Sequence, residues 1–179
     1  MHVRGVMMAE NTPADDGLRI VLFGTAGAGK SSLLGALAQA AQTQRQVLGG
    51  ELTDATGGLA ELQRATYDNK QRETQEEIVP YPVTLQADAT IPATLIDCNG
   101  RLAQDYLGGK RSLDERALLS EAIADADALV LAVGPAEQSQ LAQTFDQFTQ
   151  FLTLFEQRRG RRGDIAGLPV YLVLTKCDL

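Results

Sequence analysis

A glycine-rich segment that ends in Gly-Lys-Ser carries the clearest chemical pattern in the chain. Residues 24–31 fit Gly-x-x-x-x-Gly-Lys-Ser, with Gly24, Gly29, Lys30 and Ser31 in the four defining positions. Glycines let the backbone turn tightly and point successive N–H groups at one anion. A lysine at this place supplies a positive charge for β- and γ-phosphates, and a serine hydroxyl can ligate Mg²⁺. The pattern therefore predicts a loop that binds a nucleoside triphosphate.

The flanking sequence supports this interpretation over a chance glycine-rich turn. An apolar strand is expected at residues 20–23, and a helix with apolar residues at helical spacing is expected over residues 30–46. The start of that helix adds the positive end of its dipole to the loop. The expected nucleotide contacts are the whole loop and the residue after it: Gly24, Thr25, Ala26, Gly27, Ala28, Gly29, Lys30, Ser31 and Ser32.

A second pattern, Asp-x-x-Gly, begins at Asp97, the last residue of an apolar strand expected at residues 91–97. Asp97 would deliver a carboxylate to the Mg²⁺ side of the loop, usually through water. The backbone N–H of Gly100 would meet the γ-phosphate, so that a triphosphate orders this segment and a diphosphate releases it. Asp-x-x-Gly alone is common in plain turns, and it gains meaning here from its place after a phosphate-loop pattern.

A third pattern, Thr-Lys-x-Asp, follows the apolar run Val170–Leu174. The Asp178 carboxylate can accept hydrogen bonds from N1–H and the N2 amino group of guanine, a donor pair that adenine lacks. The stem of Lys176 would cover the face of the base, and Thr175 opens the motif. A polar turn after a strand is the alternative. The two upstream patterns, in this order, favour guanine recognition.

The elements expected around these patterns describe one α/β domain over residues 18–179. Strands that alternate with helices predict a mainly parallel sheet with helices on both faces and a ligand site beyond the carboxyl ends of the strands. Prolines 80 and 82 place one strand at a sheet edge. The expected strands are 20–23, Ile78–Gln86, 91–97, Ala128–Val133 and Val170–Leu174; the expected helices are 30–46, 59–72, 113–124 and Gln138–Arg159; residues 47–58 are expected to form a loop.

Composition narrows the classes of function. The chain has 179 residues and a formal net charge of −7, which argues against specific nucleic-acid binding. No apolar run approaches the length of a transmembrane segment, and residues 1–17 are expected to form a flexible leader without a signal-peptide core. Cys98 and Cys177 lie within the candidate nucleotide motifs and not at metal-ligand spacing, which favours a reducing, cytoplasmic setting.

Together, the three motifs resemble those of P-loop GTPases of the translation-factor-related class, which includes Ras-like, septin-like and dynamin-like branches. The resemblance runs from Arg19 to Asp178, and the forms Ala-Gly-Lys-Ser-Ser and Thr-Lys-x-Asp are most similar to dynamin-like and other bacterial GTPase domains. It implies binding of GTP or GDP with Mg²⁺, slow hydrolysis and a molecular switch built from two mobile loops. We also expect a protein effector or activating partner, or a nucleotide-dependent dimer.

The resemblance further implies a threonine in the first switch that meets Mg²⁺ and the γ-phosphate. Thr53, Thr56, Thr66 and Thr74 are candidates, and the length of a two-strand hairpin ending at Asp97 favours Thr74. A solvated threonine is an equally good interpretation of Thr74. The expected Mg²⁺ ligands are thus Ser31, Thr74 and Asp97.

The catalytic group is where the chain departs from the family. Many Ras-like members have a water-orienting Gln directly after Asp-x-x-Gly, whereas this chain has Arg101. Arg101 can stabilise phosphoryl charge, although a surface role is the better interpretation of that residue. The groups expected around the reacting phosphate are Lys30, Thr74, Gly100 and Arg101. We therefore expect slow intrinsic hydrolysis that a dimer or partner accelerates.

Two other functions also fit the sequence. A non-hydrolysing nucleotide-binding scaffold domain would fit the missing glutamine, and an ATPase would fit if Thr-Lys-x-Asp is coincidental.

Proteins of the family that the chain resembles continue after the base-reading Asp with a strand, a loop and a closing helix. The sequence ends at Leu179, and we expect it to be a fragment whose C-terminal strand and helix are missing.

Overall fold

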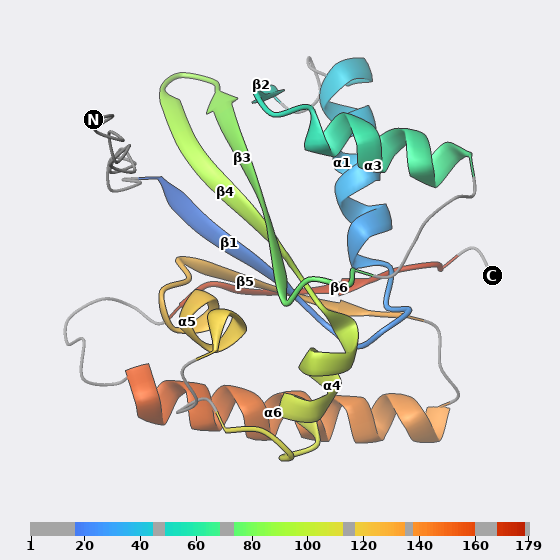
Figure 1. The fold of residues 1–179 in the computed structure, drawn as a ribbon, viewed down its shortest axis with the longest axis vertical. Coiled ribbons are helices and arrows are strands. Elements are labelled where there is room, and N and C mark those ends of the chain that lie inside the picture. Colours follow the sequence, from blue (N-terminus) through green and yellow to red (C-terminus); the bar gives the residue numbers. More distant parts are fainter. Residues whose placement is uncertain are drawn as a thin grey trace, which may run out of the picture.

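The computed structural model of the protein describes residues 17–44, 49–68, 74–112, 117–134, 138–159 and 168–177. Its elements surround one six-stranded sheet (Figure 1). The leader expected at residues 1–17 lies outside the described residues except for Gly17, and Asp178 lies outside them as well.

The sheet is mixed, so the prediction of a mainly parallel sheet is wrong at one edge. Its order is β2-β3-β4-β1-β5-β6, in which β4, β1, β5 and β6 run parallel while β2, β3 and β4 pair antiparallel. Only three residues join β3 to β4, which is enough for a hairpin and too few for a parallel crossover. The strands are β1 (Leu18–Phe23), β2 (Glu51–Asp54), β3 (Ile78–Gln86), β4 (Thr90–Cys98), β5 (Ala128–Val133) and β6 (Val170–Leu174).

The predicted position of the edge strand is also wrong. β2, expected as loop, occupies the edge and pairs with β3 over residues 83–86. Pro80 and Pro82 lie in the other half of β3, which β2 does not reach, and both are exposed. Proline cannot donate a backbone hydrogen bond to a neighbouring strand. Both prolines accordingly lie in the half of β3 that pairs, among the described strands, with β4 alone.

Helices cover both faces of the sheet, as predicted (Figure 1). α1 and α3 share one face with the core residues of β1, β3 and β4, whereas α4, α5 and α6 pack on the other. α4 is absent from the predicted elements, and α5 is shorter at its start than expected within the described residues. The helices are α1 (Lys30–Thr43), α3 (Gly58–Tyr67), α4 (Gly100–Leu107), α5 (Leu118–Ala124) and α6 (Gln138–Arg159).

Alternation along β1 gives the sheet two separate cores. Val21 and Phe23 point to the side of α4 to α6, and Leu22 between them points to the side of α1. All three side chains are buried, because successive side chains of a strand point to opposite faces. β1 is thus fixed from both sides, and the glycine-rich loop that follows it starts from a rigid position.

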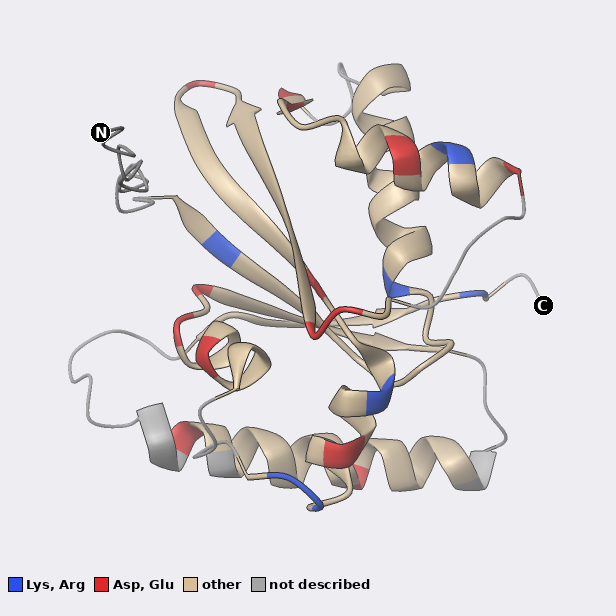
Figure 2. Cartoon of the chain, in the orientation of Figure 1, with Lys and Arg blue, Asp and Glu red and all other residues tan. Residues whose placement is uncertain are grey.

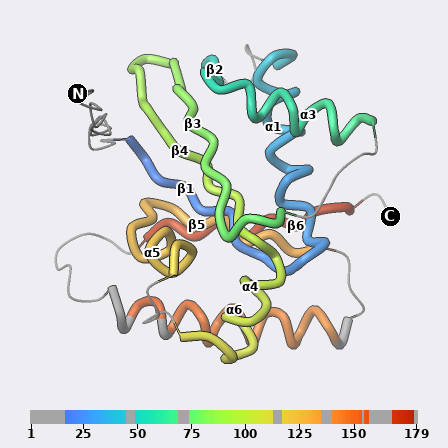
Figure 3. The backbone as a smooth tube through the Cα atoms, in the orientation of Figure 1, coloured from blue at the N-terminus to red at the C-terminus, as the bar shows by residue number. Residues whose placement is uncertain are grey.

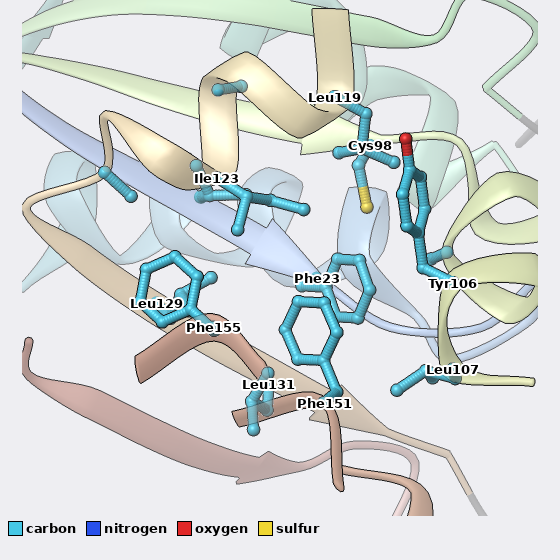
Figure 4. Packing of buried hydrophobic residues seen from close by; sticks show 14 of the residues in the cluster. Phe23, Cys98, Tyr106, Leu107, Leu119, Ile123, Leu129, Leu131, Phe151 and Phe155 are labelled. Carbon is cyan, nitrogen blue, oxygen red and sulfur yellow. The ribbon is translucent and has the colours of Figure 1, made fainter. Parts of the chain in front are cut away.

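Aromatic packing joins α6 to β1. The rings of Phe23 and Phe151 stack with centroids 4.6 Å apart, and Phe155 lies 6.5 Å beyond Phe151 (Figure 4). Offset aromatic pairs add about 0.5–1.5 kcal/mol beyond the burial of their area. The strand that leads into the glycine-rich loop is therefore held by the longest helix of the fold.

None of the helices within the described ranges is long and apolar enough to cross a membrane.

The two cysteines are expected to differ sharply in reactivity. Cys98 is buried in the core shown in Figure 4, and this burial raises the pKa of its thiol to about 12, whereas Cys177 is exposed. Because the thiolate is the nucleophile, iodoacetamide should modify Cys177 alone in the native protein and both cysteines in denaturant. Intact-mass spectrometry measures this. A second adduct on the folded protein would contradict it.

Candidate functional site

Lys30 begins α1 and folds back over the glycine-rich loop (residues 24–31). Its ammonium donates hydrogen bonds to the carbonyl oxygens of Gly24, at 2.8 Å, and Thr25, at 3.1 Å. The residue is 6% exposed, which is unusual for a lysine. An ammonium has three donors, and two of them hold the loop here. The third can serve an anion in the loop.

The N-terminus of α1 has no side-chain cap. Gly29 stands at the N-cap position with φ of 80°, a left-handed conformation that glycine adopts without strain, and the first turn contains no acidic residue. The first N–H groups of a helix lack partners within it. This end of a 14-residue helix therefore presents backbone donors and a positive dipole end to the loop.

Thr175, directly after β6, binds the loop from the other side. Its hydroxyl lies 2.7 Å from the carbonyl oxygen of Ala28 and 3.1 Å from that of Val133. Its backbone N–H also donates to Val133, at 2.9 Å. The first residue of the Thr-Lys-x-Asp motif thus positions the glycine-rich loop, a contact that the sequence pattern does not indicate.

Asp97 is the last residue but one of β4 and lies beside the start of α1. Oδ2 accepts hydrogen bonds from the hydroxyls of Ser31, at 2.7 Å, and Thr74, at 3.0 Å. Oδ1 is buried and has no hydrogen-bond partner among the described residues, in a residue that is 1% exposed. A buried carboxylate oxygen without a partner is costly and calls for a cation or an ordered water. The three residues predicted as Mg²⁺ ligands are brought together, since Ser31 and Thr74 both bond to the Asp97 carboxylate.

Tyr81 lies near Asp97 and is affected by the negative charges around it. The pKa of Tyr81 is raised to about 12, first by burial and then by the negative charges of Asp97, Glu76 and Glu61. Tyr81, Glu76 and Asp97 line a cavity of about 270 Å³ that also reaches Ser31 and Thr74. This field favours a cation beside Asp97.

Gly100 lies against the glycine-rich loop. A Cβ atom at this position would be 2.4 Å from the backbone nitrogen of Ala26 and 2.5 Å from its Cα. Only glycine lets the start of α4 approach so closely. The second sequence pattern therefore meets the first at Gly100, as well as at Asp97.

Asn99, between these two residues, is not among the site residues predicted from the sequence. Its Oδ1 accepts from the N–H groups of Arg101 and Leu102, so it caps α4. Its Nδ2 donates to the carbonyl oxygens of Thr74 and Gln75. Asparagine before the helical spacing of residues 102, 103, 106 and 107 is a capping pattern that could have revealed both α4 and this residue.

The loop, α4 and the segment after β6 together line a cavity of about 190 Å³. Three basic residues line it, at the start of α1, in α4 and in the chain after β6. Figure 2 marks the backbone of these positions in blue. The lining residues are Ala26, Gly27, Gly29, Lys30, Ser31, Ser32, Thr74, Asn99, Gly100, Arg101 and Lys176.

Thr74 is the candidate first-switch threonine that lies at this site. Thr53 lies on β2, where its hydroxyl is 3.4 Å from the carbonyl oxygen of Thr84. Thr56 donates to Asp54, and the hydroxyl of Thr66 donates to a carbonyl within α3. Asp178 lies outside the described residues, so base recognition stays a prediction from the sequence.

No protein-family model matches the chain, and a comparison with curated proteins finds no match either.

Proposed function

We propose that the protein binds GTP with Mg²⁺, hydrolyses it slowly to GDP and acts as a molecular switch. The observation that carries this proposal is the buried ammonium of Lys30, folded over the loop backbone and beside the uncapped start of α1. Both features are arranged around a space that an anion would fill. A phosphate chain matches this combination of backbone donors and one buried positive charge.

Mg²⁺ fits the residues on the opposite side of this space. Ser31 and Thr74 offer hydroxyl oxygens, and Oδ1 of Asp97 is buried without a partner. Oxygen donors are what Mg²⁺ prefers, and the ion keeps several waters when bound to protein. When bound, Mg²⁺ would neutralise phosphate charge, while Lys30 and the loop amides hold the phosphate oxygens in place.

The lining of the cavity of about 190 Å³ supports slow hydrolysis. Among its described lining residues there is no carboxylate, imidazole or glutamine that could orient a water or accept its proton, and Gln75 and Glu76 line the adjoining cavity instead. Arg101 lies on the cavity in the first turn of α4, where a guanidinium can stabilise charge on a transferring phosphoryl group. We expect a dimer or protein partner to supply the missing group.

The switch would consist of the two segments that bring Thr74 and Gly100 to the cavity. They come from different parts of the chain, and both lie beside the loop that would hold the phosphates. A γ-phosphate between them would hold both, and its loss would release them.

Displacement of a fluorescent GDP analogue tests the proposal. We expect GTP to displace it in the presence of Mg²⁺, ATP to displace it at least 100-fold less well, and Asp178→Asn to weaken GTP binding sharply. Equal displacement by GTP and ATP would support a general nucleoside triphosphatase instead. Failure of the chain to bind the analogue at all would contradict the proposal.

A nucleotide-binding scaffold that does not hydrolyse is the second candidate, because the described cavity lining holds no group that could orient water. Single-turnover measurements with GTP and Mg²⁺ separate the two. Slow conversion to GDP supports the switch, and intact GTP after many hours supports the scaffold.

A further inference from the structure

We infer that Asn99 is a positioning residue that joins Thr74 to the start of α4, so that the two flanks of the site move as one unit. This inference rests on the proposed function in what it says about Mg²⁺. Asn99 lies inside the Asp-x-x-Gly pattern but occupies none of the defining positions of the three sequence motifs. The side chain lies on the cavity wall between Thr74 and Gly100.

The acceptor half of the Asn99 amide belongs to α4. Oδ1 lies 3.0 Å from the backbone nitrogen of Arg101 and 3.3 Å from that of Leu102. With φ of −60° and ψ of 119°, Asn99 has the extended backbone of an N-cap residue. This half of the amide fixes where α4 begins, and with it the place of Gly100.

The donor half belongs to the segment before β3 (residues 74–77). Nδ2 lies 2.8 Å from the carbonyl oxygen of Thr74 and 3.3 Å from that of Gln75. The backbone N–H of Asn99 also donates to the carbonyl of Glu77, at 3.0 Å, which extends the β3–β4 ladder by one bond. Figure 3 shows this segment running from β3 towards the start of α1.

Thr74 is thereby held at two atoms. Its carbonyl oxygen is bound by Asn99, and its hydroxyl donates to Asp97 Oδ2. Two contacts on one residue fix its position and orientation, whereas the hydroxyl contact alone would let the backbone pivot. Asn99 therefore keeps Thr74 in place relative to the start of α4, which lowers the cost of ordering the two segments when they engage a ligand.

Asparagine is the side chain that performs both tasks at this length. The cap needs an acceptor, and the two carbonyls need a donor, and a primary amide supplies one of each. Aspartate and serine are equally good N-caps. Aspartate has no donor for the carbonyls, and serine has a shorter side chain with a single hydroxyl. Substitution can therefore separate the two tasks.

The opposite end of the segment offers an internal control. Oε1 of Glu77 accepts a hydrogen bond from the backbone N–H of Leu119, at 2.9 Å, at the start of α5. This contact does not involve the Asn99 side chain. Loss of the donor bonds should free residues 74 and 75 and leave the α5 contact in place.

Backbone 15N relaxation on the nucleotide-free chain tests the inference with Asn99→Ser, Asn99→Asp and Asn99→Ala. We expect the order parameters of residues 74 and 75 to fall from about 0.85, typical of a rigid backbone, to below about 0.6 in all three variants. Amide hydrogen exchange in α4 should match that of the parent protein for Ser and Asp, and be faster for Ala. Parent-like order parameters at residues 74 and 75 in the Ser and Asp variants would overturn the inference, since a residue that only caps α4 would leave them unchanged.

A second readout addresses Mg²⁺. The concentration of Mg²⁺ needed for half-maximal retention of fluorescent GTP analogue should rise at least 10-fold in Asn99→Ser, while the affinity measured without Mg²⁺ stays within twofold. An unchanged Mg²⁺ requirement would overturn the link to the metal. If the parent protein binds no nucleotide, the proposed function fails while the relaxation experiment still decides the role of Asn99.

Discussion

Replacing Lys30 with methionine is expected to weaken binding of GTP and GDP about 10- to 150-fold, because a hydrogen bond to a charged group contributes roughly 1.5–3 kcal/mol. Methionine keeps the apolar stem and removes the ammonium that bonds to Gly24 and Thr25. Fluorescence titration gives the affinity, and thermal melting monitored by circular dichroism shows whether the fold persists.

Lys110→Met is the matched control for this change. The Lys110 side chain is 76% exposed, and its ammonium lies 3.7 Å from Asp105 on the surface. Exposed ion pairs contribute little, so we expect the control to bind and melt like the parent protein. Parent-like affinity in Lys30→Met would contradict the proposed function, because that function rests on the Lys30 ammonium.

Gly100→Ala is expected to disturb the site strongly, although it adds a single methyl group. The added Cβ would fall 2.4 Å from the backbone nitrogen of Ala26, so α4 and the glycine-rich loop must separate. Overpacking of this kind costs about 1–3 kcal/mol, which corresponds to a fall in melting temperature of roughly 2–12 °C. Because Gly100 is the proposed γ-phosphate donor, GTP affinity should fall more than GDP affinity.

Gly108→Ala at the other end of α4 controls for the loss of a glycine. Its φ is −82°, and its Cβ would lie 3.2 Å from the carbonyl oxygen of Gln104, a contact that a small shift relieves. We expect little change in melting or binding. Equal effects at the two positions would mean that the loss at Gly100 reports on α4 alone and not on its contact with the loop.

The parts of the candidate site that can be predicted from the sequence are those encoded locally. The glycine-rich loop follows β1 and Asp97 lies near the end of β4, and the parallel pairing of β1 with β4 brings the ends of these strands together. Thr74 is favoured by the length of the hairpin that precedes Asp97. That hairpin is present, and the Thr74 hydroxyl reaches the carboxylate.

The parts that the sequence does not predict depend on contacts between distant residues. Asn99 acts through carbonyls more than 20 positions away, and nothing in its own sequence neighbourhood indicates them. β2 is four residues long with two acidic side chains, so only its pairing with β3 makes it a strand. Strands in both the parallel and the antiparallel part of the sheet bury residues in the two cores. The hydrophobic pattern of the sequence therefore does not tell the two parts apart.

The central position of β1 has a consequence for how the chain is made. β1 leaves the ribosome before the other strands, yet its neighbours are β4 and β5, and the second of these arrives about 100 residues later, on the order of 10 s at normal rates of synthesis. Until β5 arrives, the apolar strand can pair with β4 along one edge only, whereas the β3–β4 hairpin can pair as soon as it is complete. We expect the nascent chain to depend on chaperone protection of residues 18–23 during that interval. The glycine-rich loop would then take its shape only late in synthesis, once β1 has inserted between its two partners.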